Sequence, residues 1–76
     1  MTTLDQLLPG QRGHVVRIDG SDPIAARLRE MGFVPGRAIQ FVRSAPWGGP
    51  LNCFMEGCRL ALRTTEAKRV AIQLDC

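Results

Sequence analysis

Hydrophobic and polar residues alternate in five short stretches of this chain, the pattern of β-strands that bury one face. In Arg37–Ser44, for example, Ile39 and Phe41 fall on one face and Gln40 and Val42 on the other. Glycine, proline and Asp-Gly signals that are typical of turns separate the stretches. The pattern therefore predicts strands over residues 13–18, 37–44, 51–56, 59–63 and 69–74, with a tight turn at Gly57-Cys58 between the third and the fourth.

A helical period lies between the first two predicted strands. Ile24, Leu28 and Met31 recur at i, i+4 and i+7, so we expect them on one helical face that packs on the core. Either Ser21 or Asp22 can cap the first turn, and the glycine after Met31 is a typical helix stop.

Two shorter helical turns are expected near the ends of the chain. The segment Thr3–Gln6 has the sequence of a capping box, with Thr3 as the cap. Residues 64–67 are expected to form the second turn. Five strands with one inserted helix predict an all-β fold, because two flat sheets need more chain than 76 residues provide. A small SH3-like five-stranded β-barrel fits best, and an OB-like barrel is the alternative.

Composition narrows the class of protein. A length of 76 residues and a hydrophobic fraction of 45% predict a single globular domain over residues 1–76. The chain has neither an apolar run of the roughly 20 residues that cross a bilayer nor a secretory signal at its N-terminus, so we expect a cytoplasmic protein that is not membrane-inserted. The net charge of +3 comes from basic residues scattered singly, so we expect no nucleic-acid partner; a nucleic-acid-binding barrel remains the least favoured function.

Five short motifs in a fixed order resemble the FeoA family, and the similarity runs from about Leu4 to Ile72. The motifs are Leu7-Xaa-Pro9-Gly10, Arg27-Leu28-Xaa-Xaa-Met31-Gly32, Pro35-Gly36, Ala45-Pro46-Xaa-Gly48-Xaa-Pro50 and Ala61-Leu62-Arg63-Xaa-Xaa-Glu66-Ala67. The resemblance implies an SH3-like barrel and kinship with the C-terminal domains of metal-dependent repressors of the diphtheria-toxin-regulator type. It also implies a partner, the membrane Fe(II) transporter FeoB, which has a cytoplasmic GTP-hydrolysing domain. One departure is Gly49, where relatives tend to carry an acidic residue.

Candidate chemistry is sparse. The chain has no phosphate-binding GxxxxGK[ST] loop and no GxSxG nucleophile elbow, so we expect no enzyme. Cys53 and Cys58 flank the predicted turn, and His14 or Cys76 can approach them; thiolates with an imidazole suit Fe(II) or Zn(II). Their spacing is not that of a structural zinc site, and a buried Cys53 acting as a small hydrophobe is the alternative. A metal-sensing or metal-handling domain is thus the second candidate function.

A protein-binding groove between the helix and the loop over residues 45–50 is the first candidate site. Its predicted residues are Ala25, Leu28, Arg29, Met31 and Phe33 on the helix side and Ala45, Pro46, Trp47 and Gly48 on the loop side. Tryptophan is enriched at the centre of binding interfaces, although Trp47 can also fold back over the barrel mouth. We expect this groove to bind the cytosolic region of FeoB and to modulate Fe(II) uptake.

Overall fold

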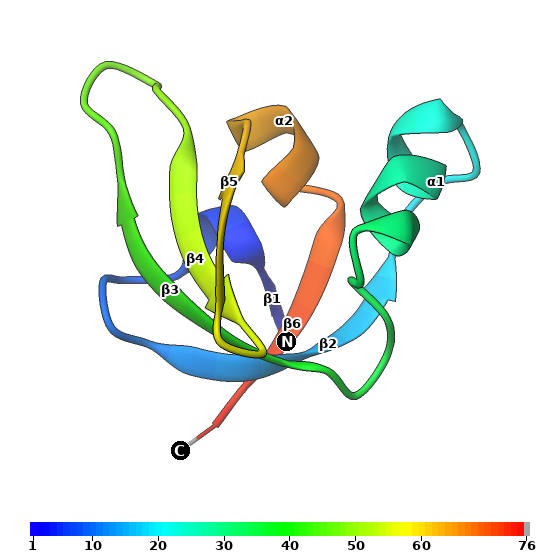
Figure 1. The fold of residues 1–76 in the computed structure, drawn as a ribbon, viewed down its shortest axis with the longest axis horizontal. Helices are drawn as coiled ribbons and strands as arrows, with labels where there is room; N and C mark the ends of the chain where they lie inside the picture. Colours follow the sequence, from blue (N-terminus) through cyan, green and yellow to red (C-terminus); the bar gives the residue numbers. More distant parts are fainter. Residues whose placement is uncertain (76) are drawn as a thin grey trace.

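Six antiparallel strands form one curled sheet in the order β1-β6-β2-β3-β4-β5 in the computed structural model, which describes residues 1–75 (Figure 1). The strands are β1 (Thr2–Thr3), β2 (Arg12–Ile18), β3 (Ala38–Ser44), β4 (Leu51–Met55), β5 (Cys58–Leu62) and β6 (Val70–Leu74). The helices are the 3-10 turn η1 (Leu4–Gln6), α1 (Pro23–Glu30) and α2 (Thr64–Ala67). All five predicted strands are present. The prediction missed β1, a two-residue strand that pairs with Ile72 and Ala71 of β6 and is too short to show a period.

A β-bulge in β2 explains how residues on either side of it are both buried in the core. Val15 and Ile18 are both buried although they are three residues apart, a spacing that an unbroken strand would place on opposite faces. The pairing of β2 with β6 shifts its register between Val15 and Arg17, so Val16 is the extra residue. The bulge returns Ile18 to the core and sharpens the curl of the sheet.

Helix α1 begins as predicted, and its buried face matches the predicted one at Leu28 and Met31 but not at Ile24. The Asp22 carboxylate accepts the Ala25 N–H at 3.1 Å, so Asp22 is the cap. Ala25 and Leu28 are fully buried and Met31 is partly buried, whereas Ile24 is 39% exposed. The predicted face was therefore wrong at Ile24, because the buried line starts one residue later, at a small alanine that contributes little to a hydrophobic period.

Two turns differ from their predicted form. The Thr3 hydroxyl donates to the Asp5 carboxylate rather than accepting a backbone N–H, so the predicted capping box does not form. In the β4–β5 hairpin, the two turn residues are Glu56 and Gly57, with φ of 51° and 78°. Cys58, predicted in the turn, is already part of β5. Positive φ at both central residues is the geometry of a two-residue type I′ hairpin turn.

A two-pronged ion pair ties the start of α1 to the start of β6. The Arg69 guanidinium donates to both Asp22 oxygens, at 2.9 Å and 2.8 Å. Hydrogen bonds from Arg69, and from the Ala25 N–H, lower the pKa of Asp22 from its usual 3.8 to about 2. The folded carboxylate therefore binds its proton less tightly than the unfolded one does.

This lowered pKa predicts an acid-sensitive part of the stability. The stabilisation from the Asp22–Arg69 pair is fully present above about pH 4 and is lost as the pH falls through the folded pKa near 2. In Asp22→Asn, which cannot ionise, we expect the melting temperature to lie below that of the wild type at pH 5 and the difference to shrink towards pH 2. Thermal unfolding followed by circular dichroism checks this, and an equal difference at both pH values would contradict it.

Candidate protein interface at the Trp47 loop

Trp47 lies at the tip of the β3–β4 loop, which extends beyond the sheet at the upper left of Figure 1. Its side chain is 99% exposed, and its φ is 59°. The Gly49 N–H donates to the Pro46 carbonyl at 3.4 Å, and Gly48 has a φ of 73°. Residues 46–49 thus form a type I′ turn with Trp47 at its first central position.

Neither packing nor backbone preference accounts for a tryptophan at this position. Type I′ turns favour Asn, Asp or Gly, because other side chains are strained at positive φ. An exposed indole gains no burial to offset this strain. The alternative in which Trp47 folds back over the barrel is therefore wrong. A bulky residue held in a strained conformation at a fully exposed tip points to a functional role.

Substituting Trp47 by asparagine should not destabilise the fold. Asn tolerates positive φ, so we expect Trp47→Asn to leave the free energy of unfolding unchanged or to raise it by about 1 kcal/mol. Urea unfolding followed by circular dichroism measures this. A loss of more than about 1 kcal/mol would show that the indole packs against the barrel and is not exposed to solvent.

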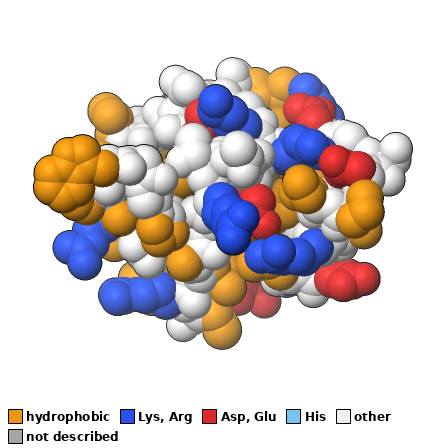
Figure 2. Space-filling model, turned by 90° about the horizontal axis from the view of Figure 1, so that it is seen from above, with side chains coloured by type: hydrophobic (Ala, Val, Ile, Leu, Met, Phe, Trp, Pro, Cys, Tyr) orange, Lys and Arg blue, Asp and Glu red, His pale blue; other side chains and the backbone are white. Residues whose placement is uncertain are grey.

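A hollow of about 550 Å³ adjoins the loop where β5 runs into α2. Its lining comprises Gly48, Gly49, Pro50, Arg63, Thr64 and Thr65, with no acidic side chain among them. We call Trp47 together with this lining the Trp47 surface. The loop is at the left end of the molecule in Figure 1, and Figure 2 shows hydrophobic and basic side chains at this end. Among the described residues visible in this view, no Asp or Glu lies at the left end.

The family model described as the FeoA domain matches residues 2–74. This chain belongs to the FeoA family. Over 71 residues it is 31% identical to the Fe(2+) transport protein A/Fe(2+) transporter FeoB fusion protein of Porphyromonas gingivalis, a match that covers 93% of the chain and 8% of that much longer protein. The chain thus spans only a small part of this curated relative.

Solved structures of FeoA proteins share its fold. Iron(II) transport protein A of Clostridium thermocellum is 33% identical with a TM-score of 0.88, over 96% of this chain and 45% of that one. FeoA of Stenotrophomonas maltophilia, solved with zinc and described as an SH3 domain protein, is 39% identical with a TM-score of 0.82, over 96% and 91%. The fold alone is shared, at 14% to 21% identity and TM-scores of 0.82 to 0.85, with the manganese regulator SloR, a manganese-dependent transcriptional repressor and IdeR of T. acidophilum. The predicted SH3-like fold and the predicted resemblance to the FeoA family are confirmed.

The predicted groove between helix and loop does not form in this FeoA chain. Ala25, Leu28 and Phe33 are fully buried in the core, so their side chains cannot meet a partner. The Arg29 guanidinium donates to the Ile18 and Gly20 carbonyls at 3.3 Å and 3.1 Å, which makes it a structural contact. Helix α1 and the β3–β4 loop stand at opposite ends of the molecule, with α2 between them in Figure 1.

Only the loop half of the predicted set therefore shares one surface. Ala45 and Pro46 lead into the turn at Trp47, and Gly48 follows it. Met31, from the helix half, is partly buried against the core. The groove prediction missed the rest of the hollow's lining, including Arg63, which follows the end of β5. A signal for it was present, because Arg63 belongs to one of the five family motifs.

The predicted metal ligands are not brought together. Cys53 is buried, and this burial raises the pKa of its thiol to about 11, which disfavours the thiolate that binds metals. Cys58 is exposed, while His14 Nδ1 lies 3.3 Å from the Asp75 carboxylate. Within residues 1–75, no three His, Cys, Asp or Glu side chains are placed to hold a metal ion. Cys76 lies outside the described residues.

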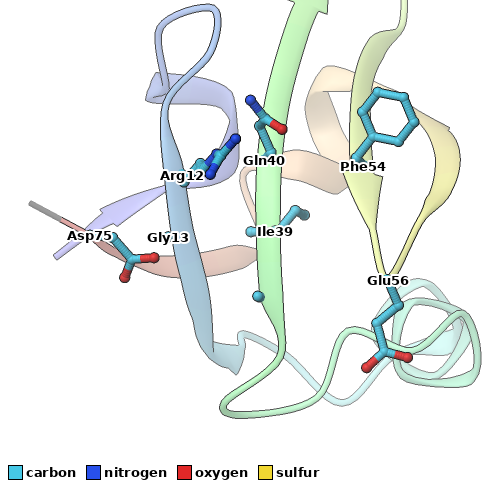
Figure 3. Close-up of a pocket in the computed structure, with 8 residues that line it drawn as sticks. Arg12, Gly13, Ile39, Gln40, Phe54, Glu56 and Asp75 are labelled. Atoms are coloured by element: carbon cyan, nitrogen blue, oxygen red, sulfur yellow. The ribbon is translucent and has the colours of Figure 1, made fainter.

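A second hollow, of about 320 Å³, lies on the outer face of β2, β3 and β4 (Figure 3). Arg12 and Gln40 stand side by side in it, whereas the carboxylates of Glu56 and Asp75 point to separate borders. Both carboxylates already have partners, since Glu56 pairs with Arg37 at 3.3 Å and Asp75 with His14. This hollow therefore assembles no pair of free groups for catalysis.

In the described part of the chain, no helix has the length and apolar character needed to span a membrane.

Proposed function

We propose that this FeoA chain is a cytoplasmic accessory protein of Fe(II) uptake that binds the cytosolic region of an FeoB-type transporter and modulates it. The observation that carries the proposal is the P. gingivalis relative, in which a segment similar to this chain and an Fe(2+) transporter are one polypeptide. Fusion keeps two modules at a high effective concentration for each other. We infer from this that the FeoA segment works in contact with the transporter, and that this chain binds an FeoB-type neighbour in the same way.

The Trp47 surface is the part of the molecule that best suits this binding. Interfaces depend on a few large side chains, with Trp and Arg the most enriched, seated beside pockets. Trp47 and Arg63 supply both residue types around one hollow. The proposal therefore places the FeoB contact at the loop end of the barrel and leaves α1 with a structural role.

Binding to the immobilised cytosolic region of the cognate FeoB tests the proposal. We expect the wild-type chain to be retained and Trp47→Ala to bind at least about 30-fold more weakly, the loss of a binding hot spot. Ile24→Ala is the matched control, because it removes a partly exposed hydrophobic side chain from α1, and its affinity should stay within about 2-fold of the wild type.

Fe(II) uptake by cells that lack the chain gives the functional readout. Uptake should fall and should recover with the wild-type chain or with Ile24→Ala, but not with Trp47→Ala. Failure of the wild-type chain to bind the cytosolic region, together with unchanged uptake in its absence, would overturn the proposed function.

A further inference from the structure

We propose that the partner segment seated on the Trp47 surface is acidic and carries an apolar side chain that covers the Trp47 ring. This inference rests on the proposed function and specifies the chemistry of the contact. It follows from how the charges of the described residues are distributed and from what the loop leaves uncovered.

Most acidic residues of the described chain already have a basic partner. Within residues 1–75, four ion pairs join Arg17 to Asp19, Arg69 to Asp22, Arg37 to Glu56 and Arg27 to Glu66, and Asp75 contacts the His14 ring at 3.3 Å. Of the two remaining carboxylates, Asp5 accepts a hydrogen bond from the Thr3 hydroxyl, and Glu30 ends α1. Glu66 is the acid that comes close to Arg63, since its carboxylate accepts the Arg63 N–H at 2.9 Å, but it is buried and already pairs with Arg27. Among residues 1–75, no exposed carboxylate is paired with a guanidinium of the loop end.

Two arginines at the loop end of the sheet lack a carboxylate partner within residues 1–75. Arg43 is exposed on β3 opposite Asn52, and Arg63 is exposed directly after β5 and lines the hollow. Glu56 lies at the opposite end of β4, which rises about 3.3 Å per residue, too far to reach either guanidinium. Guanidinium groups bind carboxylates in two-pronged hydrogen bonds, so these arginines favour Asp or Glu of a partner.

The loop also presents uncovered apolar area beside these charges. The Trp47 indole has no packing partner, and the open backbone at Gly48 has no atom within 4 Å of where a Cβ would stand. A partner can therefore approach the ring and the adjoining hollow closely. A partner segment with an apolar side chain flanked by carboxylates would cover the indole and pair with the arginines. Because residue 49 is glycine and not an acid, the loop carries no carboxylate of its own to compete for them.

The test is the affinity for the FeoB cytosolic region at low and high salt, with charge-reversal variants. We expect binding to weaken at least about 10-fold between about 50 mM and about 500 mM NaCl, since salt screens exposed charges. Arg63→Glu and Arg43→Glu should each weaken binding at least about 10-fold at low salt. Arg12→Glu makes the same change in net charge in the hollow that Glu56 and Asp75 also line, and it should have less than about a 3-fold effect.

The outcomes separate this inference from the function it rests on. Binding that is insensitive to salt and to both reversals would overturn the acidic partner and leave the proposed function standing. Absence of any binding would overturn both. Vesicles containing phosphatidylserine provide the remaining arm: if they bind the chain more tightly than the cytosolic region does, through Trp47 and Arg63, the occupant is a lipid surface and the inference fails.

Discussion

Phe33→Ala should lower the free energy of unfolding by about 3–5 kcal/mol, the cost of truncating a buried aromatic side chain in a core that relaxes only in part. Phe33 is fully buried, and its N–H donates to the Leu28 carbonyl at 3.2 Å, which anchors the chain as it leaves α1. A chain of this size has a small core and little stability to spare, so we expect the variant to be largely unfolded at physiological temperature. Urea unfolding followed by circular dichroism measures the loss.

Val34→Ala is the control for this prediction. Val34 is the next residue and is exposed, so its truncation should change the free energy of unfolding by less than about 0.5 kcal/mol. If Phe33→Ala kept wild-type stability and instead lost affinity for FeoB, Phe33 would face the partner, as the sequence had suggested, and the core assigned here would be wrong.

Gly13→Ala should destabilise the barrel by about 3 kcal/mol through a backbone clash in the centre of the sheet. Gly13 lies in β2 between Ile39 of β3 and Leu74 of β6. A Cβ at Gly13 would stand 2.5 Å from the Gln73 carbonyl oxygen and 2.7 Å from Ile72 Cγ2. Because the nearest atom belongs to the backbone, rotation of a side chain cannot relieve the clash, and the two strands must separate.

Hydrogen exchange combined with urea unfolding checks this effect. We expect faster exchange of amides in β6 of Gly13→Ala, together with the lower free energy of unfolding. His14→Ala, which truncates the neighbouring half-buried side chain, should cost less than about 1 kcal/mol. A wild-type exchange pattern in Gly13→Ala would show that β2 and β6 are more widely spaced than described.

The fold was predictable because its signals are local. Strict alternation in β3 separates Ile39 and Phe41 from Gln40, and the cap at Asp22 lies next to the helix that it starts. Two of the misses were at points where strand pairing decides the outcome. Strand β1 is defined by its pairing with β6, and the bulge at Val16 depends on the register of β2 with β6.

Only the loop half of the candidate site was predictable, because the rest depends on how distant parts of the chain are arranged in space. Composition singled out Trp47, but its strained φ is set by closure of the 46–49 turn, and the distance of α1 from the loop is set by how the whole sheet curls. Alternation over residues 51–56 could have placed Cys53 on the core face with Leu51 and Met55, and so argued against its role as a metal ligand.

The fluorescence of Trp47 tests most directly whether this surface docks on the transporter, because Trp47 is the single tryptophan of the chain. Addition of a saturating amount of a tryptophan-free FeoB cytosolic region should shift the emission to shorter wavelength and protect the indole from quenching by acrylamide. Complex formation seen by analytical ultracentrifugation, with emission and quenching unchanged, would show that the partner binds elsewhere and would contradict the account.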